Sequence, residues 1–351
     1  MDVIDKPRDI RSGEELDIKK VNEFLRDSVP RLTGEITIKQ FPSGNSNLTY
    51  CISIGNTELI LRRPPFGKKA KSAHDMGREY RILKALKPVF PYCPEPLAYS
   101  EDESIMGCPF YVMERLHGII LRKEIPEGLE FTHDEMRKLC ENYITLWADL
   151  HSIDYKKIGL ENFGNPEGYV RRQVEGWSKR YRDAKTPDAP DFERVMIWLH
   201  EHMPDDSAAP AVIHNDFKLD NVVLNPEKPT QIIGLLDWEM ATIGDPIMDL
   251  GSGLAYWVQN DDTDKLKMVR MHPTTADGAL SREQLVQHYS RTTGRVIESF
   301  DYYYCFGLFR LAVIAQQIYY RYYHGQTKDQ RFQFFIHGIR IFEDTALSLI
   351  S

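Results

Sequence analysis

The chain has 351 residues, of which 42% are hydrophobic and 27% are charged, which is typical of a folded globular protein. This length fits about two domains of roughly 150 residues each. The formal net charge of −8 gives no support to a nucleic-acid partner. Residues 1–20 mix both charges without an apolar run, so we expect neither a signal peptide nor a membrane anchor. Five scattered cysteines with no CxxC pair indicate buried thiols in a reducing compartment, so we expect a cytoplasmic protein. Arg310 divides the most apolar stretch, 302–320, and neither part approaches the ~18 uncharged residues that span a bilayer, so we expect no membrane partner.

The first third of the sequence has the pattern of a small antiparallel sheet. Three strand-like runs, separated by turn signals, lie at 35–41, 48–54 and 58–63. A helix is predicted over about 71–86, and two more strands are predicted near 95–99 and 110–116. Ser12 and Glu15 form a capping box, which predicts that an N-terminal helix begins there.

The remaining two thirds of the sequence have a mainly helical pattern. Thr132 and Glu135 form a second capping box, and apolar residues follow at helical spacing over 136–151. Two short predicted strands, near 212–213 and 231–236, interrupt the helical segments. The predicted fold class is therefore α+β, with a β-rich lobe, a hinge and a larger helical lobe at 1–113, 114–118 and 119–351.

One motif between the predicted helices carries the chemistry. Residues 214–221 read His-Asn-Asp-Phe-Lys-Leu-Asp-Asn, which is the pattern H-x-D-x-x-x-x-N. Phosphoryl transfer requires an aspartate aimed at the acceptor hydroxyl and, a few residues later, an oxygen ligand for Mg²⁺. The spacing assigns the first role, as base or orienter, to Asp216 and the second role to Asn221. Average composition predicts only roughly 0.03 such matches per chain.

A second aspartate strengthens this interpretation. Asp237 ends the apolar run 234–236 and follows Asn221 by sixteen residues, where a kinase places the carboxylate that joins Mg²⁺ to the β- and γ-phosphates. An aspartate that merely caps a strand would explain Asp237 alone, but not its position after the first motif. Together the motifs predict a phosphotransferase that uses ATP and Mg²⁺.

With these motifs the sequence resembles the aminoglycoside phosphotransferase family, which is related to the protein kinases and includes choline kinase-like enzymes. The resemblance extends over about 39–326, and it is most specific to the branch found as the kinase portion of some acyl-CoA dehydrogenase fusion proteins. Further segments match the family in order: 44–50, 60–62, 78–80, 112–115, 150–151 and 244–251. The resemblance implies a two-lobed, protein-kinase-like fold.

The resemblance also implies a nucleotide site. The family's phosphate loop corresponds to 43–47, where backbone and side-chain groups would hold the triphosphate: Gly44, Asn45, Ser46 and Asn47. Arg62 occupies the position of the lysine that kinases pair with a helix glutamate, here Glu79. Because an arginine fork differs from an ammonium, this is a departure from the kinase pattern. In the hinge, the carbonyl of Glu114 and the N–H of Leu116 would bind the adenine edge.

The resemblance gives roles to two more residues near the motif. Lys218 could reach the γ-phosphate, as an equivalent lysine does in many protein kinases, although a solvated lysine would fit the sequence almost equally well. Asp249 is expected to hydrogen-bond the backbone of the loop that contains Asp216.

The acceptor is expected to be a small molecule, because the docking platform of the protein kinases is missing. Asp237 and Asp249 are only twelve residues apart, and no A-P-E motif occurs. A cluster of basic residues on the predicted helix 169–185 could hold the phosphates of coenzyme A: Arg171, Arg172, Lys179, Arg180 and Arg182. Together with the resemblance to the acyl-CoA dehydrogenase branch, this cluster favours a hydroxyacyl-CoA as the acceptor.

Other interpretations stay open at the level of sequence. The basic cluster fits equally well as the polar face of an amphipathic helix. The acidic stretch 261–264 would suit a polycationic aminoglycoside or an amino alcohol. A non-catalytic nucleotide-binding scaffold is a further alternative, which the complete set of Asp216, Asn221 and Asp237 disfavours.

Overall fold

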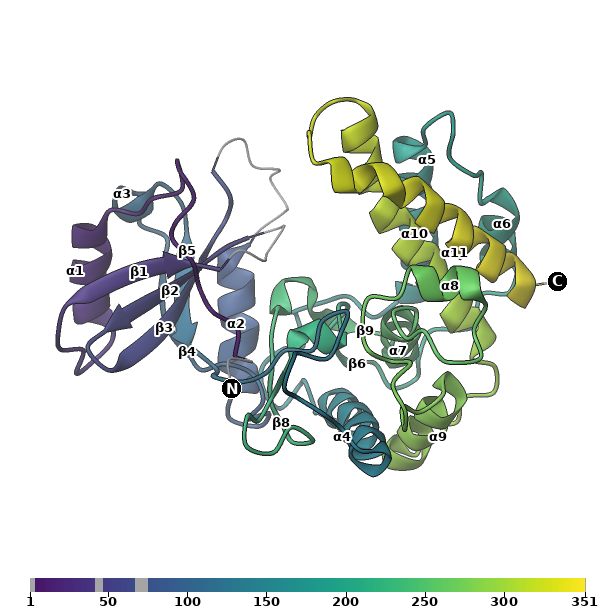
Figure 1. Cartoon of the computed structure of the whole chain (residues 1–351). Helices are drawn as coiled ribbons and strands as arrows, with labels where there is room; N and C mark the ends of the chain where they lie inside the picture. The colour runs from purple at the N-terminus through teal and green to yellow at the C-terminus, as the bar shows by residue number, and fades with distance from the viewer. Residues whose placement is uncertain (1–3, 42–46, 67–74, 351) are drawn as a thin grey trace. The chain divides into compact units, whose positions relative to one another are not determined.

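The computed structural model describes residues 4–41, 47–66 and 75–350 (Figure 1). Contacts divide the chain into two compact units, which are Met1–Ile120 with Asn221–Ala241, and Leu121–Asp220 with Thr242–Ser351. The segment 221–241 thus belongs to the first unit, whereas the sequence predicted one continuous helical lobe from residue 119 onward. One reason is a long-range backbone pairing, in which Ile119 exchanges two hydrogen bonds with Leu224. The hinge at 114–118 stays a prediction.

The first unit is built on a five-stranded antiparallel sheet with the strand order β1-β2-β3-β5-β4. Its strands are β1 (Ile36–Gln40), β2 (Leu48–Ile54), β3 (Thr57–Arg63), β4 (Pro96–Ser100) and β5 (Phe110–Glu114). The five strands that the sequence predicted are confirmed, with ends that differ by two residues or fewer. A separate hairpin of β7 (Val222–Leu224) and β8 (Ile232–Leu235) also belongs to this unit.

Helices pack on both faces of this sheet. They are α1 (Ile18–Ser28), α2 (Met76–Leu86) and the short α3 (Glu103–Met106). Because side chains alternate along a strand, Leu61 of β3 lies in one core cluster with Leu25 of α1. The next residue, Arg62, points to the other face, where it meets Glu79 of α2. The alternation of β3 thus places a charged side chain beside α2.

The N-terminal helix starts later than the sequence predicted. It begins at Ile18, and the carboxylate of Asp17 caps it by accepting hydrogen bonds from two backbone N–H groups of the first turn. The capping box expected at Ser12 is wrong, because the carboxylate of Glu15 accepts a hydrogen bond from the backbone of Gly13 instead. Such local bonds compete with helix formation.

The second unit is mainly helical. Its helices are α4 (His133–His151), α5 (Tyr169–Ala184), α6 (Glu193–Glu201), α7 (Pro246–Leu254), α8 (Asp264–Met268), α9 (Arg282–Thr293), α10 (Asp301–Tyr323) and α11 (Phe335–Leu349). The predicted capping box of Thr132 and Glu135 at the start of α4 is confirmed. A two-stranded sheet of β6 (Ala211–Ile213) and β9 (Thr242–Gly244) flanks the predicted catalytic loop in sequence. The two units together confirm the predicted α+β class.

Helix α10 is the central element of the second unit. It packs against α5, α7 and α11, and it is buried along most of its length. Within the described ranges, no helix combines the length and the apolar character needed to cross a membrane. The close approach of α7 to α10 depends on two glycines. A Cβ atom at Gly307 of α10 would clash with the carbonyl oxygen of Gly251 of α7.

We expect Gly307→Ala to lower the free energy of unfolding by about 1–3 kcal/mol, because rigid backbone atoms leave no room for the methyl group. Gly176→Ala on α5 is the matched control. An added Cβ there meets only the end of the Arg180 side chain, at 3.9 Å, so this change should stabilise the protein by about 0.5–1 kcal/mol. Denaturant unfolding measures both effects, and a Gly307→Ala protein as stable as the wild type would contradict the close packing.

Candidate active site

Arg62 lies at the centre of a charged cluster in the first unit. Its Nη1 atom lies 2.5 Å from Oε1 of Glu79 on α2. Its Nη2 atom lies 2.9 Å from Oδ1 of Asp237 and 3.6 Å from Oε2 of Glu239. Arg62 and Glu79 are buried, whereas Asp237 is partly exposed. The structure thus brings three of the predicted site residues together.

The predicted phosphate loop is described only at its end, by Asn47. The other predicted residues of this loop lie outside the described ranges: Gly44, Asn45 and Ser46. Asn47 is buried just before β2, and its side-chain amide donates a hydrogen bond to Oε2 of Glu239 at 2.6 Å. Because Glu239 also lies beside Arg62, the end of the loop is joined to the charged cluster.

The guanidinium of Arg62 stays charged within this cluster although it is buried. Burial by itself would lower the pKa of Arg62, but the carboxylates of Glu79 and Asp237 raise it, so the guanidinium stays charged. One cation therefore faces three carboxyl groups.

The two predicted metal ligands lie on neighbouring segments of the first unit. The backbone N–H of Leu236 donates to the carbonyl oxygen of Asn221 at 2.8 Å, which ties Asn221 to the residue before Asp237. Asp237 has a left-handed backbone, with φ 69° and ψ 63°, and it leads from β8 into the 3₁₀-helix η2 (Trp238–Met240). This conformation is uncommon outside glycine and clusters at functional sites. Both side chains offer hard oxygen donors, so the pair fits Mg²⁺.

The two residues predicted to bind adenine lie at the end of β5. Glu114 is the last residue of the strand, and its carboxylate pairs with Nζ of Lys87 at 3.1 Å. Leu116 follows outside any helix or strand, and its side chain packs so closely on Gly234 of β8 that a Cβ atom there would clash with it. This contact fixes the segment after β5. Adenine binding by its backbone stays a prediction.

In the second unit, Asp249 of α7 holds the backbone of the predicted catalytic loop. Its Oδ1 atom accepts a hydrogen bond from the backbone N–H of Asn215 at 2.7 Å, and its Oδ2 atom accepts one from that of His214 at 3.1 Å. The predicted bond from this carboxylate to the loop is therefore confirmed. From α4, the indole N–H of Trp147 donates to Oδ2 at 2.9 Å, and Nε2 of His151 lies 3.0 Å from the same oxygen.

These donors keep Asp249 charged although it is buried. Burial alone would raise the pKa of its carboxyl group. The contact with His151 and the hydrogen bond from Trp147 outweigh burial, so the pKa of Asp249 lies below its ordinary value. The loop is therefore anchored by a charged group with donors on both of its oxygens.

Two further side chains hold the residue before Asp216. Asn215 has a positive φ of 62°, and its backbone carbonyl accepts a hydrogen bond from Nη2 of Arg310 on α10 at 2.5 Å. Its side-chain Oδ1 accepts a hydrogen bond from the hydroxyl of Tyr169 on α5 at 3.2 Å. Our sequence analysis missed both side chains. Arg310 had a signal, because it is the single charged residue in the apolar stretch 302–320.

Aromatic packing holds the backbone after Asp216. The ring of Phe217 stacks on Trp147, with centroids 4.3 Å apart and planes inclined by 7°. The hydroxyl of Tyr143 donates to the carbonyl oxygen of Phe217 at 3.3 Å. Both partners come from α4, so the loop is fixed on either side of Asp216. A group held in this way needs little reorganisation when it reacts.

Asp216 and Lys218 lie side by side in the loop. Nζ of Lys218 is 3.2 Å from Oδ2 of Asp216 and 3.7 Å from Oδ1 of Asp220. Burial by itself would lower the pKa of Lys218, but Asp216 and Tyr256 raise it, so the ammonium stays charged. The Lys218 side chain is only 21% exposed, which argues against the alternative of a freely solvated lysine.

The basic residues of α5 are largely paired within the second unit. Three of the five form ion pairs with nearby carboxylates: Arg171–Glu175 at 3.8 Å, Lys179–Asp183 at 2.5 Å and Arg182–Glu193 at 2.7 Å. The other two, Arg172 and Arg180, contact backbone carbonyls and the ring of Trp177. Three carboxylates thus neutralise only part of the charge of the five basic residues, so the helix keeps a net positive charge, most of it in local contacts. This pattern favours the alternative of an amphipathic helix with a charged outer face.

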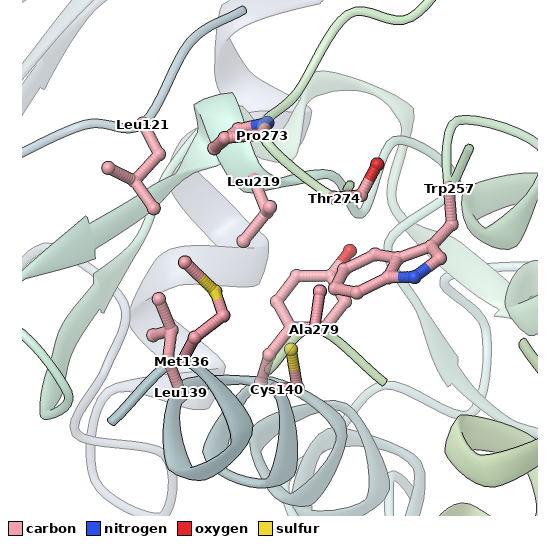
Figure 2. Close-up of a pocket in the computed structure, with 10 residues that line it drawn as sticks. Leu121, Met136, Leu139, Cys140, Leu219, Trp257, Pro273, Thr274 and Ala279 are labelled. Atoms are coloured by element: carbon pink, nitrogen blue, oxygen red, sulfur yellow. The ribbon is translucent and has the colours of Figure 1, made fainter. Parts of the chain in front are cut away.

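A small apolar cavity lies next to the catalytic loop, lined by Leu219 of the loop and by Met136, Leu139 and Cys140 of α4 (Figure 2). Its volume is about 10 Å³, close to the room that a single water molecule needs. It is therefore a packing void and not an acceptor site.

We expect Asp249→Asn to lower the free energy of unfolding by about 3–5 kcal/mol, because the amide leaves buried donors without their charged partner. This difference should shrink in acid. The pKa of Asp249 is depressed in the folded chain, so its stabilisation is complete above ~3.9 and is lost as the pH falls through the lower folded value. Denaturant unfolding of both proteins between pH ~7 and ~2 measures the effect. A difference that is constant over this range would contradict it.

The chain is similar to known proteins over most of its length. The chain matches the model of the phosphotransferase enzyme family over residues 37–295. It is 37% identical over 297 residues to acyl-CoA dehydrogenase family member 10 of Mus musculus, covering 84% of this chain and 27% of that protein. It is 31% identical over 342 residues to acyl-CoA dehydrogenase family member 11 of Homo sapiens, covering 95% of this chain and 43% of that protein. The chain thus spans less than half the length of these relatives.

Solved structures confirm the kinase-like fold. A proposed aminoglycoside phosphotransferase from Ralstonia eutropha superposes with a TM-score of 0.79 and 26% identity, over 95% of this chain and 99% of that chain. A choline kinase from Cryptosporidium parvum superposes with a TM-score of 0.61 and 14% identity, over 95% of this chain and 98% of that chain. A spectinomycin phosphotransferase in complex with ADP and spectinomycin superposes with a TM-score of 0.58 and 11% identity, over 95% of this chain and 98% of that chain. The chain belongs to the phosphotransferase enzyme family.

Proposed function

We propose that this chain transfers the γ-phosphoryl group of ATP to a hydroxyl group of a small molecule. The observation that carries the proposal is the catalytic loop, in which Asp249 fixes the backbone and Lys218 lies beside Asp216. Membership of a phosphotransferase family supports the reaction class. The ADP complex of the spectinomycin phosphotransferase supports a nucleotide as the donor.

In the proposed reaction, Asp216 orients the acceptor hydroxyl and accepts its proton while the hydroxyl oxygen attacks the γ-phosphorus. A bond forms between these two atoms, the bond to the bridging oxygen breaks, and ADP leaves. The ammonium of Lys218 stays charged beside Asp216 and stabilises negative charge on the phosphoryl oxygens.

Residues of the first unit are proposed to bind the nucleotide. Arg62 would pair with phosphate oxygens, since a guanidinium can serve a carboxylate and a phosphate together. Asn221 and Asp237 would hold Mg²⁺, which when bound supplies positive charge to the β- and γ-phosphate oxygens. The backbone groups of Glu114 and Leu116 would bind the adenine edge.

For the acceptor we favour a hydroxyl group on an acyl-CoA. The support is that both curated relatives are acyl-CoA dehydrogenase family members. Ion pairs occupy three of the five basic residues of α5, which weakens the argument from the basic helix, so the proposal rests mainly on the relatives.

An aminoglycoside or amino-alcohol kinase is the alternative, and the names of the solved neighbours favour it. Its support in the sequence was the acidic stretch 261–264. Asp262 of that stretch is paired with Arg282 through two contacts of 2.6 and 2.7 Å, which neutralises part of its charge. A non-catalytic scaffold is the least supported, because it would not need Asp216 held beside Lys218.

Asp216→Asn should lower kcat by about 10²–10⁴-fold, the range for losing a positioned general base, while nucleotide binding persists. Asp183→Asn on the exposed face of α5 makes the same chemical change away from the loop and should leave kcat unchanged. Release of ADP measures turnover, and nucleotide-dependent thermal shifts measure binding. Near wild-type turnover by Asp216→Asn would remove this residue from the mechanism.

Removal of Mg²⁺ with EDTA should abolish turnover, and Asp237→Ala should lose turnover together with the Mg²⁺-dependent thermal shift caused by ATP. Asp264→Ala, at a fully exposed carboxylate, is the control and should behave as the wild type. Full activity of metal-free enzyme would show that the reaction needs no divalent cation.

The acceptor is tested by comparing kcat/KM for hydroxyacyl-CoAs, the matching free hydroxy acids and kanamycin-like polyamines. We expect a clear preference for the thioester. Repeating the assay at low and high salt separates specific binding from charge attraction, because salt screens exposed charges. Equal turnover of the free acid, or a preference for the polyamine, would rule out the acyl-CoA proposal and leave the phosphotransferase proposal standing.

A further inference from the structure

A buried histidine contacts the catalytic loop from the segment that follows α8. His272 is 2% exposed, and its Nε2 atom lies 3.3 Å from Oδ1 of Asp220, a close polar contact to a buried oxygen that accepts no hydrogen bond of good geometry from the described residues. Asp220 belongs to the loop, but the motif H-x-D-x-x-x-x-N assigns it no role. This contact therefore joins the loop to a segment about fifty residues later in the chain.

The segment that carries His272 is fixed independently of Asp220. Arg270 donates to the carbonyl oxygen of His272 at 2.9 Å and pairs with Glu124 at 2.7 Å. On the other side, the hydroxyl of Thr274 donates to the carbonyl oxygen of Val258 at 2.5 Å. The imidazole is thus presented to the loop from a backbone that is held on both sides.

The same oxygen of Asp220 also lies near Lys218, which in turn contacts Asp216. Oδ1 of Asp220 lies 3.7 Å from Nζ of Lys218, which lies 3.2 Å from Oδ2 of Asp216. The ring of Tyr256 flanks this row, 5.4 Å from the Lys218 ammonium and 6.0 Å from the His272 ring. A lysine side chain is long and flexible, so it needs such neighbours to keep its ammonium in one place.

We propose that His272 is a positioning residue for phosphoryl transfer, which acts through Asp220 to hold the Lys218 ammonium beside Asp216. The proposal rests on the proposed function, in which Lys218 stabilises the transferred group. Its physical basis is that a displacement of about 1 Å in a reacting group costs roughly 100-fold in rate. His272 itself touches neither nucleotide nor acceptor in this proposal.

The kinetic test compares three variants. His272→Leu should lower kcat by roughly 10- to 100-fold with little change in KM for ATP. His272→Gln, which keeps an N–H donor near the position of Nε2, should recover part of the loss. Thr274→Val removes the other anchor of the same segment without touching Asp220, so it should lower the thermal stability but not kcat.

A double-mutant cycle then separates positioning from stability. In a Lys218→Met background, His272→Leu should cause no further loss of kcat, because the group that it positions is gone. An independent, multiplicative loss in that background would overturn the proposal. So would a Thr274→Val protein that loses as much kcat as His272→Leu.

A readout without catalysis distinguishes this proposal from the proposed function. The rate at which an amine-acylating reagent labels Lys218, measured by mass spectrometry, should rise several-fold in His272→Leu and stay unchanged in Thr274→Val, because neighbouring carboxylates keep a buried amine in its charged, unreactive form. If the wild type transfers no phosphoryl group but labelling responds in this way, the proposed function fails and the positioning contact stands. Unchanged labelling in His272→Leu would contradict the contact itself.

Discussion

Burial of a carboxylate costs several kcal/mol unless donors surround it, and two of the donors around the buried Asp249 are backbone N–H groups of the predicted catalytic loop. The backbone N–H groups of His214 and Asn215 can satisfy this carboxylate only if the loop takes the observed path. The indole of Trp147 approaches the same carboxylate from α4 and stacks on Phe217. Asp216 lies between Asn215 and Phe217, so these contacts fix the backbone on both sides of it.

A second constraint acts in the first unit, where an arginine replaces the lysine of the kinase pattern. The two terminal nitrogens of Arg62 reach different carboxylates, with Nη1 at Glu79 and Nη2 at Asp237. A single ammonium could not span both contacts with the same planar geometry. The side chain of Asp237, whose backbone is left-handed, is thereby tied to β3. The departure in sequence thus links the proposed phosphate-binding and metal-binding residues.

The strands of the first unit and the start of α4 could be predicted from the sequence because their signals are local, such as alternation, turns and a capping box. The catalytic motif was readable for the same reason, since its residues lie within one short segment. The predicted start of α1 was wrong, because the carboxylate of Glu15 accepts a hydrogen bond from the backbone of Gly13 and does not cap a helix.

What the sequence could not give were the long-range contacts. The pairing of Ile119 with Leu224 places 221–241 in the first unit, and no periodicity in the sequence reports it. The ion pair of Arg182 was equally hidden, because its partner Glu193 comes from the next helix, whereas the other two ion pairs of α5 join residues at i,i+4 spacing. Arg310 was visible in the sequence as the single charged residue of an apolar stretch, but its partner, the backbone carbonyl of Asn215, could not be predicted without the structure.

The central claim is that this chain transfers the γ-phosphoryl group of ATP to a hydroxyl of a small molecule, with Asp216 as the residue that orients and deprotonates the hydroxyl. A single-turnover experiment with ATP that is isotopically labelled in the γ-phosphoryl group tests it most directly. Wild-type protein with Mg²⁺ and a hydroxyacyl-CoA should place the label on the acceptor oxygen, as detected by mass spectrometry of the product. Label that appears only in inorganic phosphate, over the whole panel of thioester, amino-alcohol and aminoglycoside acceptors, would contradict the account.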